Sequence, residues 1–273
     1  MNNANSQLKA CFKKEFLAFF RTKKLIILSC VFIGLAIINP VLLKGMDSIL
    51  DMPEMQAAGL TKESAYTALD GITEAVSNFS STGLLVFLLV INSFAGGEQK
   101  KRSIIIPNCS GLSSFGYLFP KFIVYPLTAF LLTVWGTLVS SGVSSLIFSE
   151  GSIEFIKVLC SGVLMGIFVM FYICLHLTLG TATGKAGMSS AVCFVSSVFL
   201  PAIFLALGSD LSYNPFGLNA MSIAALYPDN GLKSSDIFIT VIIAFVIMAI
   251  AFFLALFAQN AKKIDNSGNE ILI

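Results

Sequence analysis

Hydrophobic residues run along this chain in long blocks that charged residues separate. Six stretches of 19 to 28 residues contain no Asp, Glu, Lys or Arg. A helix needs about 20 mostly apolar residues to cross the hydrocarbon core of a bilayer. The pattern therefore predicts six transmembrane spans, at about residues 25–43, 80–97, 122–148, 157–179, 188–208 and 237–259.

The spans are predicted to be helices. Backbone groups inside lipid must bond to one another, which leaves only helices or a closed barrel. Barrel strands alternate apolar and polar residues, and runs such as LIILSCVFIGLAII do not alternate. Segment 211–228 is also free of charge, but Asn214, Pro215, Gly217 and Asn219 favour turns there. We expect it to form a re-entrant or interfacial pair of short helices outside the cell. The predicted fold class is an all-α integral membrane protein.

Composition and charge support this class and give an orientation. Charged residues make up 12% of the chain, against about 25% in soluble domains. With six spans, the loops on the side of both termini hold 13 of the 17 Lys and Arg residues. Positively charged loops stay cytoplasmic. We therefore expect residues 1–273 to form one multi-pass domain in the plasma membrane, with both termini inside the cell. An excess of 15 Lys over 2 Arg favours a bacterial source.

The segment before the first span, residues 6–24, has the pattern of an amphipathic helix. At 100° per residue, Leu8, Phe12, Phe16 and Phe19 fall within an arc of about 80°. Basic side chains lie mostly on the other face. Such a helix would lie flat in the headgroup layer with its basic face toward anionic lipid. The alternative is that it only anchors the start of the first span.

The predicted spans contain no Asp, Glu, Lys or Arg, whereas ion-driven transport normally depends on desolvated charges at membrane depth. No HExxH, GxSxG or paired carboxylates occur within a span, and no GxxxxGK[ST] phosphate loop occurs anywhere. Nor do the six cysteines form a CxxC pair, so disulfides and a metal site are not expected. His176 is the only histidine, and a packing role is favoured over a role in proton or substrate transfer. We predict that the chain is not an enzyme, and that any hydrolysis that supplies energy takes place in a separate subunit.

One predicted cytoplasmic connection, residues 98–121, contains a cluster of charged residues between two apolar spans. Glu98, Lys100, Lys101 and Arg102 lie within five positions, and three isoleucines follow from Ile104. Apolar residues on a solvated loop usually mark a contact surface. A surface helix that docks on a cytoplasmic partner would explain both features, and so would a basic interfacial helix that lies on lipid.

Taken with the six spans and the amphipathic segment 6–24, which we call the entry helix, this loop resembles that of a known family. The chain resembles the permease subunit of bacterial type 2 ABC transporters of the exporter class, over nearly its whole length. That family reads roughly E-x-x-x-G-T in this loop and G-K at its end. Glu98, Ser103 and Lys121 match in type, whereas Arg102 and Pro120 replace the glycines.

The resemblance implies an assembly of two permease subunits, identical or sister chains, with two separate ATPase subunits that bind ATP and Mg²⁺. Membrane lipid would be the other partner, and no nucleic acid is expected. The loop would fit a cleft on the ATPase, and residues 181–189 and the entry helix would add minor contacts. The coupling residues would be Glu98, Lys100, Lys101, Arg102, Ser103, Ile104 and Lys121.

The substrate implied is amphipathic: a peptide, a lipid-like molecule or a drug. Ser140, Ser144 and His176 are the candidates for a substrate path, although packing of helices through small residues explains the serines better. The alternative function is a six-span membrane scaffold or sensor that transports nothing.

Overall fold

The fold is a bundle of long helices, seen in a computed structural model that describes residues 2–50, 52–54, 66–97, 113–148, 153–207, 213–227 and 232–269. No strand occurs in these ranges. The elements are α1 (Asn2–Arg21), α2 (Lys24–Leu50), α4 (Ala68–Asn78), the π-helical turn η1 (Phe79–Gly83), α5 (Leu84–Asn92), a second π-helical turn η2 (Ser93–Gly97), α8 (Ser114–Ile147), α9 (Phe155–Thr183), α10 (Ala186–Ala206), the 3₁₀ turn η3 (Pro215–Gly217), α11 (Leu218–Ala224) and α12 (Ser234–Asn269).

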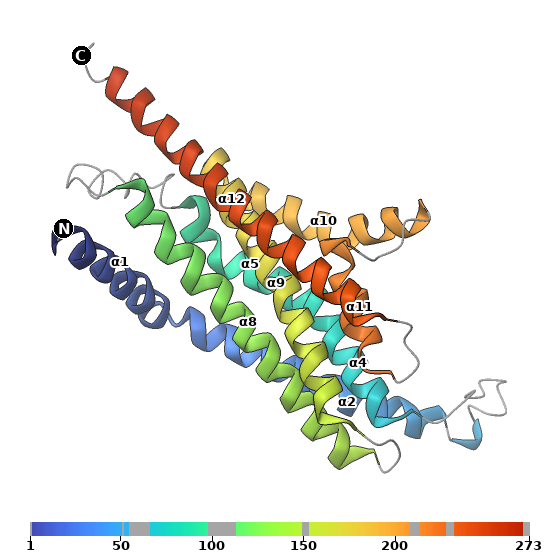
Figure 1. Ribbon diagram of the computed structural model, residues 1–273. Coiled ribbons are helices and arrows are strands. Elements are labelled where there is room, and N and C mark those ends of the chain that lie inside the picture. Colours follow the sequence, from blue (N-terminus) through green and yellow to red (C-terminus); the bar gives the residue numbers. More distant parts are fainter. Residues whose placement is uncertain are drawn as a thin grey trace.

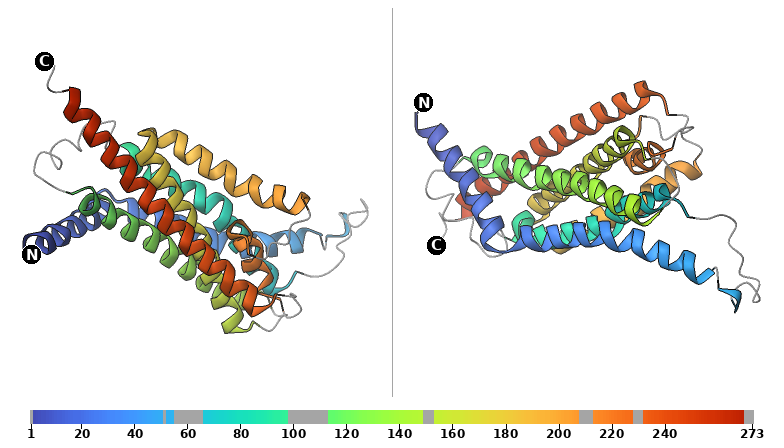
Figure 2. Two further views of the ribbon diagram at one scale, coloured as in Figure 1. Left: turned by 45° about the horizontal axis from the view of Figure 1, so that its top comes forward. Right: turned by 90° about the horizontal axis from the view of Figure 1, so that it is seen from below.

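Six helical segments of the described chain are long and apolar enough to cross a membrane, which confirms the predicted all-α membrane class. They are α2, the run α4–η1–α5, α8, α9, α10 and α12. Figure 1 shows them as one bundle, and both termini lie at the same end of it in Figures 1 and 2. We call this the terminal end and the other the opposite end.

Helix α9 forms the centre of the bundle and is buried along most of its length. Small residues let its neighbours come close. A Cβ added at Gly166 would lie 2.7 Å from the Phe130 ring of α8. By contrast, α2, α10 and α12 leave most of their apolar side chains exposed, as spans that face lipid or another subunit do.

Several helices extend beyond the predicted spans, because local caps and ion pairs set where each helix begins and ends. Helix α2 continues past Lys44, since Lys44 bonds Asp47 at 3.2 Å one turn later. A capping box between Thr67 and Asp70 starts α4 at Ala68, well before the predicted residue 80. Ser113 caps α8 through the backbone N–H of Gly116, nine residues before the predicted start of the third span.

Segment 211–228 was predicted to turn into short helices, and its described part, residues 213–227, does so as η3 and α11. Asn214 accepts a bond from the backbone N–H of Phe216 and so begins η3. The segment is tied into the bundle, since Ser222 donates to the backbone oxygen of Ser161 at 3.0 Å and Tyr227 bonds Thr73 at 3.1 Å. Its placement relative to a membrane stays a prediction.

Candidate functional site

The entry helix α1 packs across α8 at the terminal end, and this contact builds one side of the candidate site. Phe19 is almost fully buried, with its ring 5.3 Å from that of Tyr125. Phe12 meets Phe119 edge to face at 5.9 Å. Phe16 is 54% exposed, so the four predicted apolar residues do not share one partner. Part of this face packs on protein, and its predicted position in the headgroup layer stays a prediction.

The same helix buries a carboxylate that the sequence analysis did not single out. Glu15 is 2% exposed and accepts a hydrogen bond of 2.6 Å from the hydroxyl of Tyr125. Lys14 approaches the same carboxylate at 3.5 Å. The available signal was that Glu15 is the only acid before Asp47, one turn before the buried Phe19.

Lys121 lies opposite, inside α8, and its ammonium group is fully enclosed. Its exposed fraction is 1%, and Nζ donates to the backbone oxygen of Phe94 at 3.0 Å and to the hydroxyl of Tyr117 at 3.2 Å. Nζ also lies 4.5 Å from the centre of the Tyr117 ring. Phe94 belongs to η2, so Lys121 joins the two helix ends that flank the charged connection.

The corner between α1 and α2 touches η2 as well. Lys23 adopts a left-handed backbone, with φ of 58°, which reverses the chain between the two helices. Lys24 then donates to Ser93 and lies 4.0 Å from the centre of the Phe94 ring. We call Glu15, Lys24, Phe94, Lys121 and Tyr125 the end cluster, because these side chains join α1, α2, η2 and α8 at the terminal end.

The turn between α9 and α10 closes against η2 from the other side. A Cβ at Gly96 would lie only 2.8 Å from the backbone oxygen of Gly180, so only glycine permits this approach. Gly184 ends α9 in the left-handed conformation, with φ of 67°. Lys262 of α12 donates to the backbone oxygen of Thr181 at 2.6 Å. Segment 181–189, predicted to add minor contacts, is thus next to the start of the charged connection.

The predicted coupling residues divide between described and undescribed parts of the chain. Lys121 is described, and residues 114–121 of the predicted loop form the first turns of α8. Glu98, Lys100, Lys101, Arg102, Ser103 and Ile104 lie outside the described residues.

The three candidates for a substrate path lie in the interior and do not form one site. Ser140 and Ser144 are fully buried near the end of α8, and their Oγ atoms have no hydrogen-bond partner among the described residues. His176 lies near the other end of the bundle, on α9, with Nδ1 3.0 Å from Ser189 Oγ. The Nε2 atom of His176 has no partner within the described ranges.

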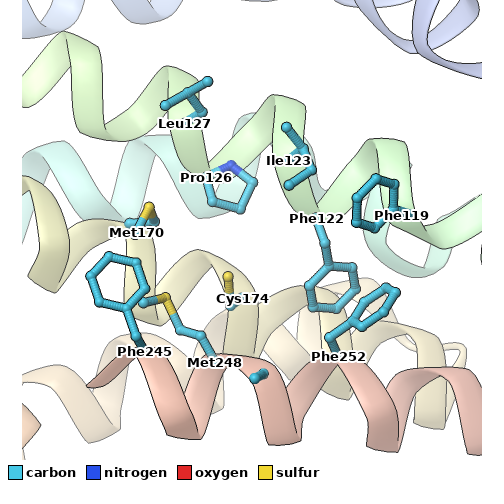
Figure 3. Close-up of a pocket in the computed structure, with 11 residues that line it drawn as sticks. Phe119, Phe122, Ile123, Pro126, Leu127, Met170, Cys174, Phe245, Met248 and Phe252 are labelled. Carbon is cyan, nitrogen blue, oxygen red and sulfur yellow. The ribbon is translucent and has the colours of Figure 1, made fainter. Parts of the chain in front are cut away.

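The structure also contains an apolar groove that the sequence did not predict. It has a volume of 370 Å³ and lies between α8, α9 and α12. Figure 3 shows aromatic, aliphatic and sulfur-containing side chains from three helices around it. The lining residues are Phe119, Phe122, Ile123, Pro126, Leu127, Met170, Cys174, Phe245, Met248, Ala249 and Phe252.

No group of three or more His, Cys, Asp or Glu side chains gathers at a point suited to a metal ion in the part of the chain that is described. Comparison with models of protein families gives no match for this chain, and a search of curated proteins gives no significant match.

Proposed function

We propose that this chain is the membrane-spanning permease subunit of an ATP-driven exporter of the bacterial type 2 ABC class. The resemblance of the charged connection and of the six-span pattern suggested this function. The observation that carries it furthest is the end cluster. Glu15 and Lys121, both buried, anchor the entry helix and the two flanks of the charged connection to one another at one end of the bundle.

Such an arrangement suits the transfer of force from a partner. A loop can move helices only if the two ends at which it joins them, its roots, are held rigidly. Flexible ends would absorb the displacement. Here the root at η2 contacts α2 through Lys24, α8 through Lys121 and the α9–α10 turn through Gly96. A push on residues 98–112 would therefore reach several spans together. In this proposal the push comes from closure of a separate pair of ATPase subunits.

The transported molecule would be amphipathic, and it would move between two permease subunits. Broad apolar faces on α2, α10 and α12 support a bundle that meets lipid or another subunit over much of its surface. The family resemblance implies export, and the charge distribution predicts that both termini lie in the cytoplasm.

The test combines co-purification of an ATPase subunit with a measurement of how the permease changes the rate of ATP hydrolysis. The chain, purified from its own cells in mild detergent, should bring with it a subunit that hydrolyses ATP. Changing residues 98, 100, 101 and 102 to alanine should leave the amount of permease in the membrane unchanged. The same change should abolish any effect of the permease on the ATPase rate, because the docking loop has lost its charges.

Lys121→Met gives a second variant, in which the root of the loop is loosened and the loop itself is unchanged. Lys157→Met is the matched control, since Lys157 pairs with Glu154 at the opposite end. We expect the first variant to weaken coupling and the second to leave it at the wild-type value. Absence of any ATPase in the purified sample, or full coupling after the four alanine changes, would refute the proposal.

A further inference from the structure

The apolar groove between α8, α9 and α12 has the features of a lipid site. Its 370 Å³ falls in the range of about 300–1,000 Å³ that is usual for small-molecule sites. Every residue that lines it is apolar or sulfur-containing. Its wall is open, since Ile123, Leu127 and Phe245 are each between 41% and 49% exposed. These three belong to helices long and apolar enough to cross a membrane, so the groove would open to hydrocarbon.

The length of the groove along α8 suits the acyl chain of a lipid. Phe119 and Leu127 are eight residues apart on α8, or about 12 Å at 1.5 Å per residue. That is most of one leaflet, whose hydrocarbon is about 15 Å deep. An acyl chain is narrow and flexible enough to lie along it.

Charge next to the groove indicates the headgroup. Phe119, at the end of the groove nearer the terminal end, contacts Phe12 of α1. On α1, Lys9 and Lys13 are exposed on either side of Phe12 in the sequence, and the only acid of this helix, Glu15, is buried. A helix with exposed lysines and no exposed carboxylate attracts anionic headgroups.

We propose that this groove binds one acyl chain of an anionic phospholipid from the leaflet at the terminal end, with its phosphate held by Lys9 and Lys13. The site is separate from the proposed coupling to an ATPase. It concerns binding from the bilayer, and its test needs neither transport nor ATP hydrolysis.

The chain offers a clean optical test because it contains one tryptophan, Trp135. In a Trp135→Phe background, Phe245→Trp places the sole indole in the groove. The full-length protein is reconstituted into vesicles of phosphatidylcholine with increasing phosphatidylglycerol, one of the two carrying brominated acyl chains that quench tryptophan. The ratio of the two quenching curves gives the relative affinity for the anionic lipid at that position.

Val195→Trp, in the same background, is the matched control. Val195 is 51% exposed and lines an apolar hollow of 420 Å³ on α10 alone. We expect phosphatidylglycerol to be preferred at position 245 by about fivefold for each lysine that reaches the headgroup, and to be preferred hardly at all at position 195. Lys9→Gln with Lys13→Gln should bring the ratio at position 245 close to one, as should Ala249→Phe, which fills the groove.

Three results would each overturn the inference. Equal preference at positions 245 and 195 would mean that anionic lipid gathers generally around the protein. A preference at 245 that survives the lysine changes would remove the headgroup contact. A lack of quenching at 245 by any lipid would show that a second copy or another protein covers the groove. Ala249→Ser, which leaves the groove open, serves as the control for folding.

Discussion

A buried hydrogen bond inside the end cluster helps to hold the entry helix to the bundle. Glu15→Ala would remove the carboxylate that accepts a 2.6 Å bond from the buried Tyr125 hydroxyl. A buried polar group left without its partner costs about 1–3 kcal/mol. We expect a loss of stability in that range, measured by thermal unfolding in detergent, and a smaller loss once Tyr125→Phe is also present.

The control for this cycle is Glu154→Ala at the opposite end. Glu154 is 62% exposed and pairs with Lys157, so its loss should cost less than about 1 kcal/mol. If Glu15→Ala were no more destabilising than Glu154→Ala, the carboxylate would not hold α1 in place.

The charges of Lys14 and Glu15 should affect the rate at which Cys11 reacts. Burial raises the pKa of the Cys11 thiol, Lys14 lowers that pKa and Glu15 raises it. Only the thiolate reacts with maleimides. In a variant whose other cysteines are serine, Lys14→Gln should raise the pKa further and slow alkylation at pH 7.5. Glu15→Gln should lower the pKa and speed it.

The whole curve of alkylation rate against pH should shift, to higher pH for Lys14→Gln and to lower pH for Glu15→Gln. Lys9→Gln is the control, because Lys9 is not among the groups that act on this thiol. Equal rates for Lys14→Gln and the parent would show that the helix does not hold the ammonium group near the thiol.

Among the elements, η2 depends most on a close backbone contact. Gly96→Ala would place a Cβ 2.8 Å from the backbone oxygen of Gly180, which cannot move without shifting α9. Overpacking of this kind costs about 1–3 kcal/mol. Gly34→Ala in α2 is the control, because nothing lies within 4 Å of the added atom. It should be neutral or stabilise the helix by up to about 1 kcal/mol. Thermal unfolding of both variants in detergent measures the difference, and a Gly96→Ala protein as stable as the parent would show that η2 does not pack there.

Helix class and number were predictable because membrane spans depend on long apolar runs, which one sequence displays directly. Their ends were less predictable, since Lys44 and Asp47 neutralise each other within α2 and Ser113 caps α8 far from the first charge-free residue. Lys121 was identified by type, but its burial depends on Phe94 and Tyr117, which only the folded chain brings to it. The burial of Glu15 and the existence of the groove could not be derived from local patterns, because both depend on which helices become neighbours.

At the scale of the whole molecule, the prediction to test is the orientation of the bundle in the membrane, that is, which end faces the cytoplasm. The terminal end and the opposite end are defined by the bundle, and the 13 of 17 basic residues assigned to the first predict that it is the cytoplasmic one. In a chain whose native cysteines are serine, Lys185→Cys would mark the α9–α10 turn at the terminal end. Tyr213→Cys, at a position 53% exposed, would mark the segment before α12. An impermeant maleimide should label position 213 in intact cells and position 185 only after the membrane is opened. Labelling of position 185 in intact cells would mean that the charged connection faces the outer medium, where no ATPase could reach it. The coupling proposal would then fail for a reason independent of any single side chain.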